Sequence, residues 1–179
     1  MDINDQIKRL TEIGIALSSE LNLDALLEKI VLHARKLTSA DAGTLYLLSD
    51  ERLEFTILQN ESLGIFKGGI TGKSIDLKPV EMNETNVSAY AALKKKTVTI
   101  SDVYESEEFD FTGPRRYDAI TGYRSRSMLV VPMMDHESRV IGVLQLMNAL
   151  TNEGEVTVFS DNAVTLAESL ASQAAVAIN

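Results

Sequence analysis

The sequence of 179 residues contains no cysteine. Disulfides, thiolate metal sites, iron–sulfur clusters, cysteine nucleophiles and thioether-linked chromophores all require sulfur as a ligand or a nucleophile. All of these classes are therefore excluded together. A chain without disulfides is typical of a reducing compartment, and we expect a cytoplasmic location.

Long apolar runs and an excess of basic residues are also missing. No stretch approaches the roughly 18 consecutive apolar residues that a membrane span needs, and the N-terminus lacks a basic segment followed by an apolar block. We therefore expect neither secretion nor membrane contact from this segment. The chain has 17 basic against 26 acidic residues, a formal net charge of -9. Because that charge repels phosphate backbones, nucleic acid is not an expected partner.

Histidine is scarce, with His33 and His136 as its two occurrences. His33 lies beside the apolar stripe of a predicted helix, where a half-buried packing role is favoured over a haem or metal ligand, and His136 lies in a polar turn. Five carboxylates within residues 102–110 fit no calcium-loop spacing and indicate a solvated acidic loop. We therefore predict no metal site and no catalytic residues, and we do not expect an enzyme.

One glycine-rich segment resembles a phosphate-binding loop. Residues 68–74 read GGITGKS, but the P-loop motif would need glycine at position 67, where this chain has Lys67. The motif also needs a helix directly afterwards, and residues 75–79 (IDLKP) do not favour one. The segment is therefore predicted to be a flexible structural loop.

The composition that is present, 45% apolar and 24% charged, is that of a globular domain with one core. Apolar residues recur at three- and four-residue spacing over residues 2–20 and again over residues 23–37, with Asn22 as N-cap of the second segment. Two helices are predicted there. Residues 43–48 and 53–58 are short, rich in β-formers and separated by a polar tetrad, which predicts a β-hairpin.

The middle of the chain predicts an alternation of loops, short helices and strands. Residues 59–85 are glycine-rich and are expected to be mostly loop, with one short strand near residues 74–77. A helix is predicted over 87–95, a strand over 98–100 and a helical turn around 115–120 that follows a Gly113-Pro114 breaker and ends at Gly122. Residues 125–134 and 140–148 are almost continuously apolar, which is typical of central strands, with Pro132 marking a bulge or local edge.

The last predicted helix runs from about residue 160 to Asn179 and shows no glycine, proline or basic stop signal. We therefore expect the chain to be a fragment whose C-terminal helix continues. The pattern as a whole predicts the α+β class in a single domain over residues 1–179. Its parts are N-terminal helices (2–37), a sheet with a pocket (42–157) and a C-terminal signalling helix (158–179).

A candidate binding site combines two segments. Phe109, Phe111, Tyr117 and Tyr123 cluster around Asp118 and Thr121, which suits a small planar ligand held by aromatic faces and by hydrogen bonds to its edge. The helix that starts at Asn86 offers N–H groups and the positive end of a helix dipole to an anion. The alternative is that these aromatic residues fill the core under a long loop, and composition alone favours it.

Three motifs then identify a family. The segments TGYRSRSMLVVPM (121–133), VIGVLQLMN (140–148) and ASQAAVAIN (171–179) closely resemble a GAF domain, and NVSAYAAL (86–93) and FDFTGPRRYD (109–118) extend the likeness. The resemblance is to bacterial signalling GAF domains that precede HD-type phosphohydrolases or nucleotide cyclases, related to those of cyclic-nucleotide phosphodiesterases. It implies a central antiparallel sheet of about six strands. The terminal helices would lie on one face and a ligand pocket with a loop or helix lid on the other.

The resemblance also implies a ligand and the residues that bind it. In cyclic-nucleotide-binding members, the purine is held by the lid and the phosphate by the start of the short helix. The ligand-binding residues carried over to this chain are Asn86, Val87, Ser88, Phe109, Phe111, Tyr117, Asp118 and Thr121. Those members carry an Asn-Lys pair and, after a Phe, an Asp-Glu pair whose Lys–Asp bridge braces the lid. This chain has Asn148 and Phe159, but Ala149 replaces the Lys and Ala163-Val164 replaces the Asp-Glu pair.

The resulting expectation is a regulatory small-molecule sensor domain of a larger bacterial signalling protein. It would dimerise through its terminal helices and relay ligand occupancy to a covalently linked output domain, with cAMP or cGMP as the candidate ligand. A ligand-free spacer that only dimerises and relays is the alternative. Bilin attachment and the sulfoxide-reducing chemistry of some GAF proteins both need cysteine and are excluded.

Overall fold

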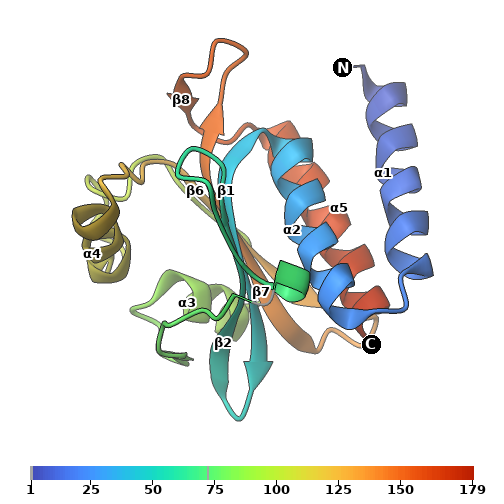
Figure 1. The fold of residues 1–179 in the computed structure, drawn as a ribbon, viewed down its shortest axis with the longest axis horizontal. Coiled ribbons are helices and arrows are strands. Elements are labelled where there is room, and N and C mark those ends of the chain that lie inside the picture. Colours follow the sequence, from blue (N-terminus) through green and yellow to red (C-terminus); the bar gives the residue numbers. More distant parts are fainter. Residues whose placement is uncertain (1, 72) are drawn as a thin grey trace.

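The computed structural model describes residues 2–71 and 73–179. An open antiparallel sheet with the strand order β3-β2-β1-β7-β6-β5 forms its centre, and two further two-residue strands join at β2 and β7. The α+β class, the antiparallel sheet and the terminal helices on one face are confirmed (Figure 1). The strands are β1 (Ala40–Ser49), β2 (Arg52–Asn60), β3 (Ile65–Gly68), β4 (Val80–Glu81), β5 (Val98–Ile100), β6 (Met128–Met134), β7 (Val140–Leu150) and β8 (Val156–Thr157).

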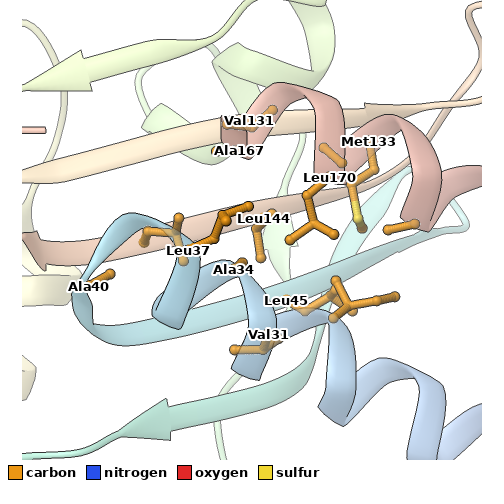
Figure 2. Close-up of a cluster of buried hydrophobic side chains, with 14 of the residues drawn as sticks. Val31, Ala34, Leu37, Ala40, Leu45, Val131, Met133, Leu144, Ala167 and Leu170 are labelled. Atoms are coloured by element: carbon orange, nitrogen blue, oxygen red, sulfur yellow. The ribbon is translucent and has the colours of Figure 1, made fainter. Parts of the chain in front are cut away.

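Three helices cover one face of the sheet: α1 (Ile3–Ser19), α2 (Leu23–Thr38) and α5 (Asp161–Ile178). Asn22 caps α2 as predicted, because its side chain accepts a hydrogen bond from the amide of Ala25 at 3.0 Å. Figure 2 shows how side chains of α2 and α5 pack against those of the central strands in a core of buried apolar residues. Its labelled members are Val31, Ala34, Leu37, Ala40, Leu45, Val131, Met133, Leu144, Ala167 and Leu170.

The predicted hairpin is confirmed as β1 and β2. Asp50 and Glu51 form a two-residue turn, and both have positive φ (50° and 60°), which matches the twist of the flanking strands. The register shifts between Leu45 and Tyr46, so one extra residue of β2 is accommodated there.

The two predicted central strands, β6 and β7, lie between β1 and β5 with their side chains buried on both faces. Pro132 pairs with Val143 of β7 on one side. On the other side β5 ends at the pair Val98 and Val130, so Pro132 lies at a local edge, and the register shifts just after it. Both features were expected of a proline in this position.

The loop predicted over residues 59–85 needs correction. No strand forms at residues 74–77, whereas β3 pairs with β2 from Asn60–Ile65 to Ile57–Gly68. β3 therefore takes residues 57–60 of this edge of β2, and residues 52–53 of the same edge pair with β4 at residues 80–81, not with residues 74–77. A 3-10 turn (η1, Gly69–Thr71) follows β3, and no helix begins at Lys73, so the described part of the GGITGKS segment lacks phosphate-loop geometry. Gly72 of that segment lies outside the described residues.

Two shorter helices, α3 (Val87–Lys94) and α4 (Thr112–Thr121), lie on the opposite face of the sheet (Figure 1). Helix α4 begins three residues earlier than predicted, and Gly113-Pro114 does not break it. Pro114 occupies the first turn, where a backbone N–H has no acceptor within the helix, so its missing donor costs nothing there. Gly122 ends the helix at φ 79°, as predicted for a glycine C-cap.

Candidate functional site

The start of α3 is closed by its own cap. The Asn86 side chain accepts hydrogen bonds from the amides of Ser88 (2.9 Å) and Ala89 (3.2 Å). The N–H groups that were expected to receive an anion are therefore occupied in this conformation. Val87 is buried among apolar side chains of the second core and does not line an open site.

Ser88 points from α3 to the sheet. It is 1% exposed, and its hydroxyl donates a 2.8 Å hydrogen bond to Oε1 of Gln145 on β7. Tyr46 is buried on β1, and burial raises its pKa to about 12 against the opposing effect of Ser88. Ser88 is thus the contact through which α3 meets polar groups of the central strands.

The first two aromatic residues of the predicted lid pack onto α3. The ring of Phe109 lies 5.0 Å from that of Tyr90 on α3 and 6.2 Å from that of Phe111, in edge-to-face arrangements. Phe111 is 3% exposed, and the neighbouring amide of Asp110 donates to the carbonyl of Thr85 at 2.7 Å. For Phe111, the core-filling alternative describes the structure.

Asp118 is turned inward and fully bonded. It is 6% exposed and accepts hydrogen bonds from the Tyr104 hydroxyl (2.6 Å) and from the amide (2.9 Å) and hydroxyl (2.8 Å) of Ser125. The bond from the Tyr104 hydroxyl to Asp118 is the main cause that raises the pKa of Tyr104. Asp118 holds α4 to the chain on either side of it, and its carboxylate is not turned toward a ligand.

Tyr117 and Thr121 lie on the part of α4 nearest the end of the sheet. The Thr121 hydroxyl donates to the carbonyl of Tyr117 at 2.7 Å and is engaged within the helix. Tyr117 is half-buried, its ring lies 6.4 Å from that of Tyr123, and the buried Asn60 of β2 acts on its hydroxyl by lowering the pKa. Burial is the main cause that raises the pKa of Tyr117.

The sheet beneath these helices carries polar residues that the sequence analysis did not select. Leu58, Thr44, Gln145 and Val130 are direct cross-strand partners on β2, β1, β7 and β6, so their side chains share one face in a single row. Ser88 of α3 contacts Gln145, which assigns the row to the face of α3 and α4. Thr44 and Gln145 are the polar members of this row, and Leu58 is an apolar one. We call Leu58, Thr44 and Gln145 together the polar row.

The polar row is incompletely covered. Gln145 lies on a strand at the centre of the sheet, yet its side chain is only half-buried, and so is that of Leu58. The rows on either side are closed by their own apolar residues: Tyr46 and Val143 lie in one, Ala42 and Met147 in the other. The signal in the sequence was a glutamine inside VIGVLQLMN, a polar residue that an apolar central strand does not need.

The other candidates can be placed briefly. His33 on α2 is half-buried on the helix side, where burial lowers its pKa, and His136 is exposed in the β6–β7 turn as expected. Within residues 2–71 and 73–179, no three His, Asp or Glu side chains gather as a metal site would need. Two surface hollows lie elsewhere, one beside Ile3 and Asn162 and one beside Arg52 and Met82.

The sequence and the fold can now be compared with known proteins. The family model of the GAF domain matches residues 22–178. The chain belongs to the GAF family. Phosphodiesterase relatives match this GAF domain over most of its length. It is 27% identical over 162 residues to the dual 3',5'-cyclic-AMP and -GMP phosphodiesterase 11 of Drosophila melanogaster, covering 83% of this chain and 10% of that protein.

A second relative is the cGMP-specific 3',5'-cyclic phosphodiesterase of Drosophila erecta, which is 27% identical over 161 residues and covers 86% of this chain and 13% of the relative. This GAF domain therefore spans about a tenth of the curated relatives it matches. No described helix is both long and apolar enough to span a membrane.

Solved structures share the fold at low sequence identity. The GAF domain of a phosphoenolpyruvate-protein phosphotransferase from Coxiella burnetii has a TM-score of 0.75 at 14% identity and covers 99% of this chain and 95% of that one. The free methionine-R-sulfoxide reductase of Neisseria meningitidis has a TM-score of 0.66 at 18% identity and covers 97% and 87%. A GAF domain of a phosphotransferase and a reductase are thus both among the structural neighbours of this GAF domain.

Proposed function

We propose that this GAF domain is a regulatory small-molecule sensor of a larger signalling protein in the bacterial cytoplasm. The observation that carries the proposal is the half-buried Gln145 at the centre of the sheet, beside Thr44 and on the face that carries α3 and α4. A hydrogen-bonding side chain that is incompletely covered at the centre of a sheet loses packing contacts. Such a position suits a ligand with a polar edge.

Cyclic nucleotides are the first ligands to test. Two relatives are named for cyclic-AMP and cyclic-GMP hydrolysis, which supports the class. The amide of Gln145 and the hydroxyl of Thr44 suit the edge of a purine, and Tyr117 offers an aromatic ring near the end of the row. A phosphate at the start of α3 requires Asn86 to rotate away from the amides of Ser88 and Ala89.

Signal relay follows from the two layers of the fold. The polar row and α4 lie on one face of the sheet, and α1, α2 and α5 lie on the other, at the two ends of the chain (Figure 1). A ligand that binds more tightly when α4 is in one of two positions shifts the population toward that conformation. The terminal helices then pass the change to a linked output domain. We propose that pairing of these helices in a homodimer carries the signal.

The second candidate is a ligand-free spacer that dimerises and relays. The observation in its favour is the packing of Val87, Phe109 and Phe111 against one another and α3, which closes part of the expected site without a ligand. Catalysis by the domain itself is not proposed. The reductase neighbours have an enzymatic role, but a chain without cysteine has no thiol for a redox cycle.

Thermal unfolding of the purified protein with cAMP, cGMP and unrelated nucleotides tests the proposal. A ligand at about 100 times its dissociation constant adds ~2.7 kcal/mol and raises Tm by roughly 5 to 10 °C in a domain of this size. Native mass spectrometry of the same sample detects any co-purified small molecule. If neither method finds a ligand and the dimer mass is present, the spacer replaces the sensor.

A further inference from the structure

The hydroxyl of Tyr123 joins three parts of the chain that are far apart in sequence. It donates a 2.6 Å hydrogen bond to Oδ2 of Asp41 on β1 and accepts a 3.0 Å hydrogen bond from Nδ2 of Asn148 on β7. Tyr123 itself directly follows Gly122, the C-cap of α4. One hydroxyl therefore connects the end of α4 with two adjacent central strands.

Asp41 depends on this bond. Its side chain is buried, and its other carboxylate oxygen accepts from the Ser62 hydroxyl at 2.8 Å. A buried carboxylate is costly unless donors satisfy it, so removing the Tyr123 hydroxyl leaves one of its oxygens without that donor. Asp41 lies three residues after Thr38, the last residue of α2, so its position is tied to the end of that helix.

Asn148 forms the second half of the connection. It is buried with φ of 59°, a backbone conformation that asparagine tolerates better than most residues. Its side chain also donates to the carbonyl of Arg124 at 2.9 Å and accepts from the amide of Arg126 at 2.7 Å. Asn148 therefore holds the segment after α4 to the end of β7, from which the chain continues to α5.

The same connection lies beside the polar row. Asp41 precedes Ala42, and Ala42 lies two residues before Thr44 on β1, where Thr44 pairs with Gln145. A ligand that binds above Thr44 and Gln145 acts on this connection when it displaces α4, whose C-cap Gly122 directly precedes Tyr123. Any movement that lifts the C-terminal end of α4 displaces Tyr123 from Asp41 and Asn148.

We infer that Tyr123, Asp41 and Asn148 form a latch that couples the position of α4 to the end of α2 and to the end of β7. This inference rests on the proposed sensor function, because it specifies how occupancy of that site reaches the terminal helices. Ala149 and Ala163, which stand at the sequence positions of the Lys–Asp bridge, are buried in the helix-side core and make no polar connection to α4.

The latch is tested without any ligand, by amide hydrogen exchange of the whole chain. Tyr123→Phe keeps the ring and removes the hydroxyl. We expect exchange on the order of 10-fold faster in α4 and also at residues 38–42 and 147–150, because a charge-assisted hydrogen bond is lost. Tyr104→Phe is the matched control. It removes the bond to Asp118 and is expected to speed exchange in α4 but not at residues 38–42.

Faster exchange confined to residues 112–127 in Tyr123→Phe, or the same pattern in both variants, would overturn the latch. A double variant with Asp41→Asn gives a second readout. If the residues act as one unit, the double variant exchanges no faster than Tyr123→Phe alone, whereas additive effects contradict the coupling. These outcomes do not depend on a ligand, so a failed ligand screen and a failed latch are distinguishable.

Discussion

The hydroxyl of Ser88 on α3 donates a 2.8 Å hydrogen bond to Oε1 of Gln145 at the centre of the sheet. This bond is the point where a helix of the ligand face engages the polar row. Ser88 is buried and Gln145 is half-buried. This face of the sheet is therefore covered at Ser88 and only partly covered at Gln145.

Ser88→Ala removes the donor and leaves Oε1 of Gln145 without this partner. We expect the free energy of unfolding to fall by about 1 kcal/mol, the usual net value of such a hydrogen bond. Chemical denaturation measures it. Ser19→Ala is the control, because the Ser19 hydroxyl bonds a carbonyl of its own exposed helix and its loss is expected to be close to neutral. Equal effects in the two variants would contradict the role of Ser88.

Phe111→Ala distinguishes a core residue from a ligand contact. With 3% exposure and a place in the second core, Phe111 is expected to contribute ~3–5 kcal/mol to stability. The variant should therefore unfold at a clearly lower denaturant concentration in the absence of any ligand. Unchanged stability would show that Phe111 belongs to an open binding site and that the packing described here is not maintained in solution.

Gly142→Ala tests a close backbone approach within the sheet. A Cβ on Gly142 would lie 2.3 Å from the carbonyl oxygen of Tyr46 and 2.7 Å from Cε of Met133. The two strands must separate, and we expect a loss of at least ~1–3 kcal/mol in unfolding free energy. At Gly113, in the first turn of α4, a Cβ would meet no atom beyond its chain neighbours within 4 Å, so Gly113→Ala should cost less than Gly142→Ala, the remaining cost coming from the contact with Pro114.

Asp135 is expected to make the stability of the protein fall at acidic pH. It accepts hydrogen bonds from the amides of Arg139 and Glu137, which lower its pKa to about 2. A depressed folded-state pKa adds stability that is present above the unfolded value near 3.8 and is lost as pH falls toward 2. Asp135→Asn should therefore flatten the pH dependence of Tm between pH 4 and 2. An unchanged slope would contradict this assignment.

Local signals were enough for much of the fold. Asn22 as N-cap, Gly122 as C-cap and the apolar runs of β6 and β7 each depend on neighbours in sequence, and each prediction is confirmed. The strand expected at residues 74–77 is wrong because strand formation depends on a free partner edge. Residues 65–68 pair with residues 57–60 of β2, residues 80–81 pair with residues 52–53, and only long-range pairing determines which segments take that edge.

The candidate site was harder to predict, for a geometric reason. Phe111 and Asp118 were chosen for their chemistry, but the structure turns both inward, the first to the core and the second to Ser125. Thr44 and Gln145 were missed because they are separated by about a hundred positions along the chain and become neighbours only through the register of β1 and β7. Their binding roles, like those of the predicted residues, remain proposals.

The central claim is that the polar row is the floor of a ligand site, and Gln145→Met tests it most directly. Methionine keeps the length of the side chain, fills the half-open position with an apolar group and removes the polar edge. The account predicts that a ligand identified by native mass spectrometry or by thermal shift raises Tm of the wild-type protein by several degrees and leaves Tm of Gln145→Met unchanged. An equal shift in both proteins would contradict the account, as would the absence of any ligand from the wild-type protein.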